Sequence, residues 1–226
     1  MRWIKNCLRR LQEYAERRFL GIAFQQMLWR YRHIYKRGWA ERYLETVNHP
    51  HRQQLVDAVA EFDPLASILE IGCASGANLV RLREHFPEVE LIGLDINARA
   101  VAVGQTHFAS CGDNRVRLVN AKVEMLCLMS KHSVDVVFAD AVLMFITPDR
   151  IQSVLAEMAR VARKAIILNE YHGAGLVNGA FLGGRWAYDF VSLLQRELPQ
   201  ADIRTRKSSF VGGAWDVYGT LIEVRL

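Results

Sequence analysis

From residue 67 onward, short apolar runs alternate with longer amphipathic stretches, and this alternation constrains the fold more than any other feature of the chain. A short apolar run between turn residues is typical of a buried strand, and a longer amphipathic stretch is typical of a helix. Strands are expected at 67–71, 90–95, 116–120, 134–139 and 165–169, and helices at 76–86, 97–110 and 148–162. Such an alternation predicts an α/β fold with a doubly wound, mostly parallel sheet.

The region after residue 170 follows a different pattern. A glycine-rich loop at 173–184 holds five glycines and no charged residue, and it fits either a lid over a ligand or a flexible connector. A helix is expected near 185–197. Two strand-like runs follow, around Ile203 and at 217–224, joined through Gly212 and Gly213. This short connection favours an antiparallel pair at one edge of the sheet.

The composition is that of one folded domain with an extension. Of the 226 residues, 51% are hydrophobic and 23% are charged, which supplies a sizeable core and excludes a disordered chain. No stretch reaches the roughly 18 to 20 apolar residues that a membrane span needs. A secretory signal is not expected, because Arg2, Lys5, Arg9 and Arg10 interrupt the amino-terminal apolar residues.

The cysteines indicate a reducing compartment. Cys7, Cys73, Cys111 and Cys127 form no Cys-x-x-Cys pair and have no matching histidine spacing. They predict neither a zinc site nor a disulfide scaffold. The expected location is therefore cytoplasmic, with a peripheral position at the inner face of the membrane as an alternative.

Positive charge is concentrated near the amino terminus. Residues 1–42 hold eleven Lys or Arg and three Glu, which gives this segment a net charge of +8. The net charge of the whole chain is +5, so the remaining residues carry −3. We expect a basic amphipathic helical extension at 1–45 and one domain at 46–226. Three interpretations of the extension stay open: a helical cap over a ligand site, an anchor on an anionic membrane surface, and a nucleic-acid contact.

The turn after the first expected strand predicts a nucleoside-containing ligand. Gly72 and Gly76 allow a tight turn and keep side chains away from a ligand at the carboxyl end of the strand. Asp95, at the end of the second strand, is placed to accept hydrogen bonds from ribose hydroxyls. Ala74 and Ala77 replace two glycines of the G-x-G-x-x-G pattern, which disfavours the pyrophosphate of NAD. An NAD-dependent oxidoreductase remains the enzymatic alternative.

Residues 65–170 resemble the class I S-adenosylmethionine-dependent methyltransferases, whose first motif runs E-x-G-x-G-x-G. Glu70, Gly72 and Gly76 match this motif, and Ala74 replaces its middle glycine. The resemblance implies a Rossmann-like sheet of seven strands with the last antiparallel, and S-adenosylmethionine as cofactor with S-adenosylhomocysteine as product. We expect the cofactor to be bound by Glu70, Gly72, Cys73, Ala74, Gly76, Asp95, Ile96, Asn120, Ala121 and Asp140.

A small-molecule acceptor is favoured, because this fold leaves little room for a substrate domain beyond the extension and the glycine-rich loop, and a hydroxyl is favoured over a nitrogen. A sugar or a lipid-linked intermediate fits such an acceptor. A hydroxyl needs a general base, and we expect His172 or Asp140 in the catalytic role because both follow strands at the carboxyl edge. The residues expected at the acceptor are His49, His51, Tyr171, His172, Arg185 and Tyr188.

Two further chemistries are disfavoured. Asp140, Asn169 and Glu170 resemble the oxygen ligands of metal-dependent catechol-type methyltransferases, but they equally fit contacts to the methionine part, and no metal is expected. Nucleic-acid methylation is disfavoured because Ala-Asp-Ala-Val stands at 139–142, in place of the Asn/Asp-Pro-Pro-Tyr/Phe segment of base amino-methyltransferases. The non-enzymatic alternative is a membrane- or partner-binding module that retains the fold.

Overall fold

The computed structural model describes residues 27–182 and 184–226 of the chain. The five expected parallel strands are present, and β4 and β5 are longer than the apolar pattern indicates. Their bounds are β1 Ser67–Ile71, β2 Glu90–Asp95, β3 Val116–Asn120, β4 Val134–Asp140 and β5 Ala162–Tyr171. With β8 (Asp202–Lys207) and β9 (Gly219–Arg225) they form a seven-stranded sheet in the order β3-β2-β1-β4-β5-β9-β8. The strand order reverses between β1 and β4, where sheets of this kind bind ligands.

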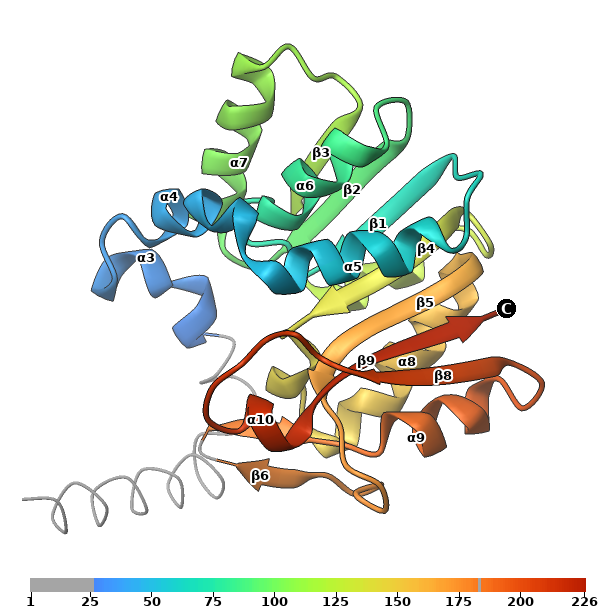
Figure 1. Cartoon of the computed structure of the whole chain (residues 1–226). Coiled ribbons are helices and arrows are strands. Elements are labelled where there is room, and N and C mark those ends of the chain that lie inside the picture. Colours follow the sequence, from blue (N-terminus) through green and yellow to red (C-terminus); the bar gives the residue numbers. More distant parts are fainter. Residues whose placement is uncertain (1–26, 183) are drawn as a thin grey trace, which may run out of the picture.

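Helices cover both faces of the sheet (Figure 1). One face is covered by α5 (Pro50–Ala60), α6 (Ala77–His85) and α7 (Ala98–Ser110). The other face is covered by α8 (Pro148–Val161), α9 (Phe190–Glu197) and the short helix η3 (Val123–Leu128). Neighbouring residues of one strand serve the two faces, since Val136 packs beneath the first set and Val137 beneath the second. This two-sided burial explains why the strands read as continuous apolar runs.

The antiparallel pair expected near the carboxyl end is confirmed. The strand β9 pairs antiparallel with both β5 and β8, so its direction is opposite to that of the other six strands of this sheet. The prediction placed its start too early, because Trp215–Tyr218 forms the short helix α10 and β9 begins at Gly219. At Gly219 a Cβ would lie 2.5 Å from the carbonyl oxygen of Trp215, so the close passage from helix to strand requires glycine.

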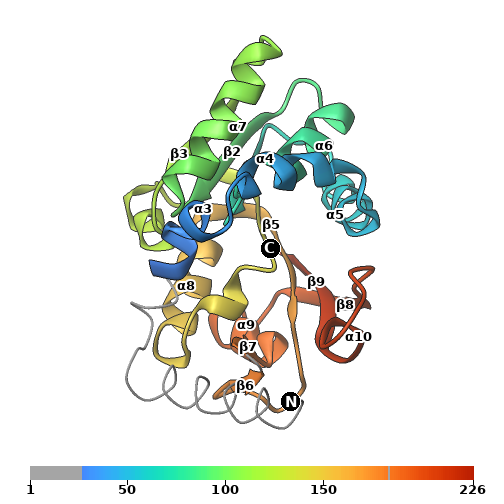
Figure 2. The same ribbon diagram turned by 90° about the vertical axis from the view of Figure 1, so that its left-hand side faces the viewer.

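The helix expected at 185–197 is shorter than predicted. Residues Arg185–Ala187 form β7, which pairs antiparallel with β6 (Ala180–Leu182), and α9 begins only at Phe190. Asp189 sets this start, because its carboxylate accepts a hydrogen bond from the backbone N–H of Ser192 at 3.0 Å. The glycine-rich segment thus contributes one strand of a hairpin. Figure 2 shows the hairpin at one end of the molecule, below α9.

The extension is described from residue 27 onward, and residues 1–26 lie outside the described part. In the described part, residues 27–30 are helical, and α3 (Arg32–Tyr35), α4 (Trp39–Leu44) and η2 (Glu45–Asn48) follow. Gly38 separates α3 from α4 with a φ of 65°, a left-handed conformation that interrupts the helix. Within the described residues, no helix combines the length and apolar character that a membrane crossing requires.

Candidate active site

The turn from β1 to α6 is built from left-handed residues at the carboxyl end of the sheet. Gly72, Ala74 and Gly76 have φ angles of 76°, 49° and 86°. A Cβ on Gly72 would lie 2.4 Å from a methyl of Val142, so this turn lies directly against the loop that follows β4. The alanine that replaces the middle glycine therefore keeps the backbone conformation of a glycine turn.

Asp95 ties this turn to the end of β2. Its carboxylate accepts hydrogen bonds from the backbone N–H groups of Ala74, at 2.8 Å, and Asn97, at 2.7 Å. Burial raises the pKa of Asp95 above its ordinary value, against the effect of these two donors. Asp95 also lines the cavity described next, so the same carboxylate that fixes the turn faces a ligand site.

A cavity of about 310 Å³, here called the first cavity, lies at the carboxyl ends of β1, β2 and β4. The described residues of the amino-terminal extension close it with Trp29, Trp39 and Tyr43. This position agrees with the cap interpretation of residues 27–45. Arg32 reinforces the cap, since its guanidinium carbon lies 4.2 Å from the ring centroid of Trp29 and 5.0 Å from that of Trp39.

The structure brings eight of the predicted site residues to the first cavity. These are His49, His51, Gly72, Ala74, Asp95, Ile96, Ala121 and Asp140. Four predicted cofactor residues support its walls from behind. Glu70 accepts a hydrogen bond from Asn78, Cys73 is buried beneath β2, Gly76 begins α6 against Phe108, and Asn120 donates to the carbonyl of Asp95.

Asp140 is the centre of a buried polar network. One carboxylate oxygen accepts hydrogen bonds from His51 Nε2 and Asn78 Nδ2, each at 3.1 Å, and the other accepts from Asn169 Nδ2 at 2.8 Å. Burial acts to raise the pKa of Asp140, but His51 and Arg52 outweigh it and hold the pKa below its ordinary value. The network thus keeps a charged carboxylate inside a largely apolar wall.

The two histidines form a chain with this carboxylate. Nδ1 of His51 lies 2.5 Å from Nδ1 of His49, while Nε2 of His51 faces Asp140. His51 is 3% exposed, whereas His49 is half-buried at the start of α5. Burial lowers the pKa of His49, and the neighbouring His51 and Arg52 lower it further. His49 is therefore neutral at neutral pH and able to accept a proton.

Sequence reasoning missed Asn78 and Arg52, which orient this network. Arg52 donates to Asn78 Oδ1 at 2.5 Å and to the carbonyl of Thr46 at 2.9 Å, and its guanidinium lies 5.0 Å from the ring of Tyr43. Burial raises the pKa of Tyr43 to about 12. The sequence offered one indication of this role, because Arg52 is a charged residue next to His51 at the start of a helix with apolar residues.

A second cavity, of about 760 Å³, adjoins the first. The two share four wall residues, Trp29, Ala141, Phe145 and Phe210. Of the residues predicted at the acceptor, Tyr171 and Arg185 line this second cavity. Their position beside the first cavity agrees with an acceptor site that borders the cofactor site.

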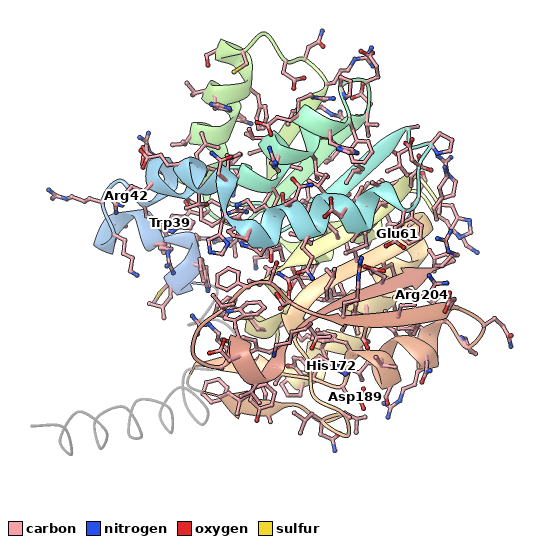
Figure 3. All side chains as sticks on the ribbon, in the orientation of Figure 1. Trp39, Arg42, Glu61, His172, Asp189 and Arg204 are labelled. Carbon is pink, nitrogen blue, oxygen red and sulfur yellow. The ribbon has the colours of Figure 1, made fainter. Side chains whose placement is uncertain are left out.

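His172 and Tyr188 occupy other positions than expected. Neither is among the described residues that line the two cavities. Nδ1 of His172 accepts a hydrogen bond from the backbone N–H of Phe190 at 3.2 Å, and the buried Tyr188 donates its hydroxyl to the carbonyl of Ile146 at 2.5 Å. Figure 3 shows His172 beside Asp189, well away from Trp39 of the cap. Both side chains therefore stabilise the start of α9 and the β4–α8 connection.

The carboxylates of Asp140 and Glu170, at the ends of β4 and β5, are engaged within the protein, whereas the buried Oδ1 of Asn169 has no hydrogen-bond partner among the described residues. Glu170 accepts hydrogen bonds from the backbone N–H groups of Val142, Leu143 and Met144 at 2.8, 2.7 and 3.2 Å. Burial raises the pKa of Glu170 to about 8, against these donors. Among the described residues, no group of three or more His, Cys, Asp or Glu side chains is arranged to hold a metal ion.

Comparison with known proteins supports the family resemblance. The model of a methyltransferase domain matches residues 68–165, the segment that contains the turn, Asp95 and Asp140. This match covers a little under half of the chain, and it bears out the resemblance of residues 65–170 to the class I S-adenosylmethionine-dependent methyltransferases. The match supports the expectation of methyl-transfer chemistry, with S-adenosylmethionine as the cofactor that the resemblance implies. No curated protein matches the sequence.

Solved structures agree with the fold of the methyltransferase. Magnesium protoporphyrin IX methyltransferase (ChlM) from Synechocystis PCC 6803 with bound SAM aligns with a TM-score of 0.61 and 18% identity, over 87% of this chain and 89% of that one. The N-terminal domain of EvdMO1 in the presence of SAH and D-fucose gives 0.58 and 18%, over 79% and 82%. An O-methyltransferase family protein from Burkholderia thailandensis gives 0.61 and 12%, over 82% and 59%.

Proposed function

We propose that the methyltransferase binds S-adenosylmethionine in the first cavity and transfers its methyl group to a hydroxyl of a small-molecule acceptor. The ribose hydroxyls are assigned to Asp95, and the adenine to the wall at Ile96 and Ala121. Gly72 and Ala74 expose backbone at this wall, which leaves room for the cofactor. Glu70, Cys73, Gly76 and Asn120 support these contacts from behind the wall. The cofactor supplies an electrophilic methyl group on a sulfonium.

The chain from Asp140 through His51 to His49 is the observation that carries the choice of a hydroxyl acceptor. Asp140 accepts a hydrogen bond from His51 Nε2–H, so we assign Nδ1 of His51 as the acceptor of a hydrogen bond from His49 Nδ1–H at 2.5 Å. This short contact is taken over the longer one of 3.5 Å, in which the backbone N–H of His51 points to His49 Nδ1. Nε2 of His49 is then the basic nitrogen. This nitrogen would take the proton of the acceptor hydroxyl while the oxygen received the methyl group that the bound cofactor supplies, and the electrons of the broken carbon–sulfur bond would remain on S-adenosylhomocysteine. The buried charge of Asp140 stabilises the imidazolium that forms.

Variants of the histidine chain test this assignment. We expect His49→Gln and His51→Asn to lower acceptor-dependent release of S-adenosylhomocysteine by about 100-fold or more, the usual contribution of a general base. Release is to be measured across a panel of phenols and sugars, with S-adenosylhomocysteine affinity measured in parallel by calorimetry. His85→Asn, at an exposed position on α6, is the control. Unchanged release in both histidine variants, or a loss in His172→Asn alone, would contradict the assignment.

We further propose that the extension holds the enzyme at an anionic membrane surface. Met27, Tyr31 and Ile34 expose 45%, 46% and 65% of their surface, close to Arg30 and Lys36 in sequence. Exposed apolar side chains among basic residues suit a membrane interface. Full-length protein is expected to sediment with phosphatidylglycerol vesicles and to stay in solution with phosphatidylcholine vesicles. Equal behaviour with both lipids, or release of the protein by competing RNA, argues against this location.

A further inference from the structure

The second cavity lies where the body of an acceptor must extend if its hydroxyl is at His49. Most of its walls come from three places that are distant in sequence: the loop after β4, the β6–β7 hairpin and the segment from Phe210 to Tyr218 that contains α10. Trp29 of the extension and Tyr171 at the end of β5 complete the lining. Figure 1 shows α10 and β6 at the same end of the molecule, and residues of both elements line the second cavity. The shared residues Trp29, Ala141, Phe145 and Phe210 join it to the first cavity.

An aromatic wall runs continuously from the histidines into the second cavity. The ring of Phe210 lies 4.6 Å from His51 and is stacked on Trp215 at 4.6 Å. Trp215 in turn contacts the ring of Tyr171 edge-on at 4.8 Å. Trp29 and Phe145, which are common to both cavities, are themselves in contact at 4.8 Å. A flat aromatic ring would make offset or edge-on contacts with such walls.

The charge that the described lining residues bring to the second cavity is positive. Of the described residues that line it, Arg185 on β7 is the charged one, and the others are apolar, aromatic or glycine. Arg185 is exposed, and no ion pair joins it to a carboxylate of the described residues. A guanidinium in this position matches a carboxylate or phosphate on the ligand, to which it can donate two parallel hydrogen bonds.

We propose that the second cavity binds an aromatic hydroxyl compound that carries an anionic group, with its ring against the Phe210–Trp215 wall and its anion at Arg185. This inference rests on the proposed function, because it takes the opposite end of the compound, the hydroxyl, to lie at His49. It narrows the acceptor to hydroxylated aromatic acids. Neutral sugars lack the anion that Arg185 would pair with.

The test uses two matched probes, a hydroxynaphthoic acid and the corresponding hydroxynaphthamide, each with its hydroxyl and its carboxyl-derived group at opposite ends of the rings. Binding to the full-length protein is measured by calorimetry in the presence of S-adenosylhomocysteine, so that no turnover is needed. We expect the acid to bind about fivefold more tightly than the amide, the effect of one partly exposed ion pair. This preference should disappear in Arg185→Gln and be restored in Arg185→Lys.

Arg204→Gln is the control, because Arg204 is an exposed arginine on β8 that pairs with Asp202 and lies away from both cavities. It should keep the preference for the acid. Equal binding of acid and amide to the unmodified protein, a preference that survives in Arg185→Gln, or tighter binding of methyl glucoside than of the acid would overturn the inference. If the acid binds through Arg185 and is not methylated, the cavity assignment stands and the proposed hydroxyl methylation fails.

Discussion

Single residues at the carboxyl edge of the sheet combine structural and chemical roles. Asp140 ends a strand that is buried along its whole length, yet it receives donors from His51, Asn78 and Asn169. A buried carboxylate is costly unless it is fully hydrogen-bonded, so this set of donors is what allows a charge to be kept beside the first cavity. The family motif predicted Asp140 at this point. The partners Asn78 and Arg52 come from two helices and depend on tertiary packing.

The pH dependence of methyl transfer follows from His49. Burial and the neighbouring His51 and Arg52 lower the pKa of His49 below the usual 6.5. The base must be unprotonated to work, so the acceptor-dependent rate is expected to rise with pH and to reach half of its maximum below about pH 6.5. A pH–rate profile of the unmodified enzyme checks this. A half-maximal rate above about pH 6.5 would show that another group accepts the proton.

Ala74 is strained in its left-handed conformation. A non-glycine residue at a φ of 49° costs roughly 1 kcal/mol, and glycine removes most of this cost. We expect Ala74→Gly to raise the free energy of unfolding by up to about 1 kcal/mol in urea denaturation. Ala77→Gly, three residues later in the first turn of α6, should lower it by about 1 kcal/mol. A loss of stability in Ala74→Gly would mean that the strain lies elsewhere.

At the scale of elements, the repeating units were predictable and the connections between them were not. Apolar runs placed β1, β2 and β3 with the bounds that the structure shows. Both faces of β1 and β2 are buried, whereas β3 lies at the edge of the sheet and buries only Val116 and Leu118. The hairpin β6–β7 and the helix α10 are short, and their residues pack against distant parts of the chain. The hydrophobic pattern of so few residues does not predict their conformation, since packing against distant parts of the chain decides it.

The loop after β4 is held by one carboxylate, and its stability should depend on pH. The pKa of Glu170 is raised to about 8 in the folded protein from 4.5 in the unfolded chain. The folded state therefore binds a proton that the unfolded state has lost, and the contribution of Glu170 to stability falls as pH rises from about 4.5 to about 8.

Glu170→Gln removes this titration while keeping one acceptor oxygen for Val142 and Leu143. The variant should lose less stability than the unmodified protein when the pH is raised through this window, as measured by urea denaturation at several pH values. Parallel curves for the two proteins would show that Glu170 stays charged throughout. Glu157→Gln, on the exposed side of α8, controls for the loss of a negative charge.

On the scale of the whole molecule, the extension and the sheet together make the site. The sheet supplies the turn, Asp95 and Asp140, which the sequence motifs indicated. The cap supplies Trp29, Trp39 and Tyr43, and α5 supplies both histidines. The charge distribution distinguished the basic extension from the mildly acidic domain, but it did not decide between a cap, a membrane anchor and a nucleic-acid contact as the role of the extension. The position of the cap depends on contacts such as Ser75 Oγ with the carbonyl of Ala40, at 2.8 Å, which no local pattern encodes.

Binding of S-adenosylhomocysteine to Asp95→Ala, measured by calorimetry, tests most directly the claim that the first cavity is the cofactor site. We expect micromolar binding to the unmodified protein and a loss of about tenfold or more in the variant, because two hydrogen bonds between ribose and a carboxylate disappear. Asp202→Ala, at the exposed edge of β8, should bind as the unmodified protein does. Equal affinity in Asp95→Ala and the unmodified protein would contradict the assignment.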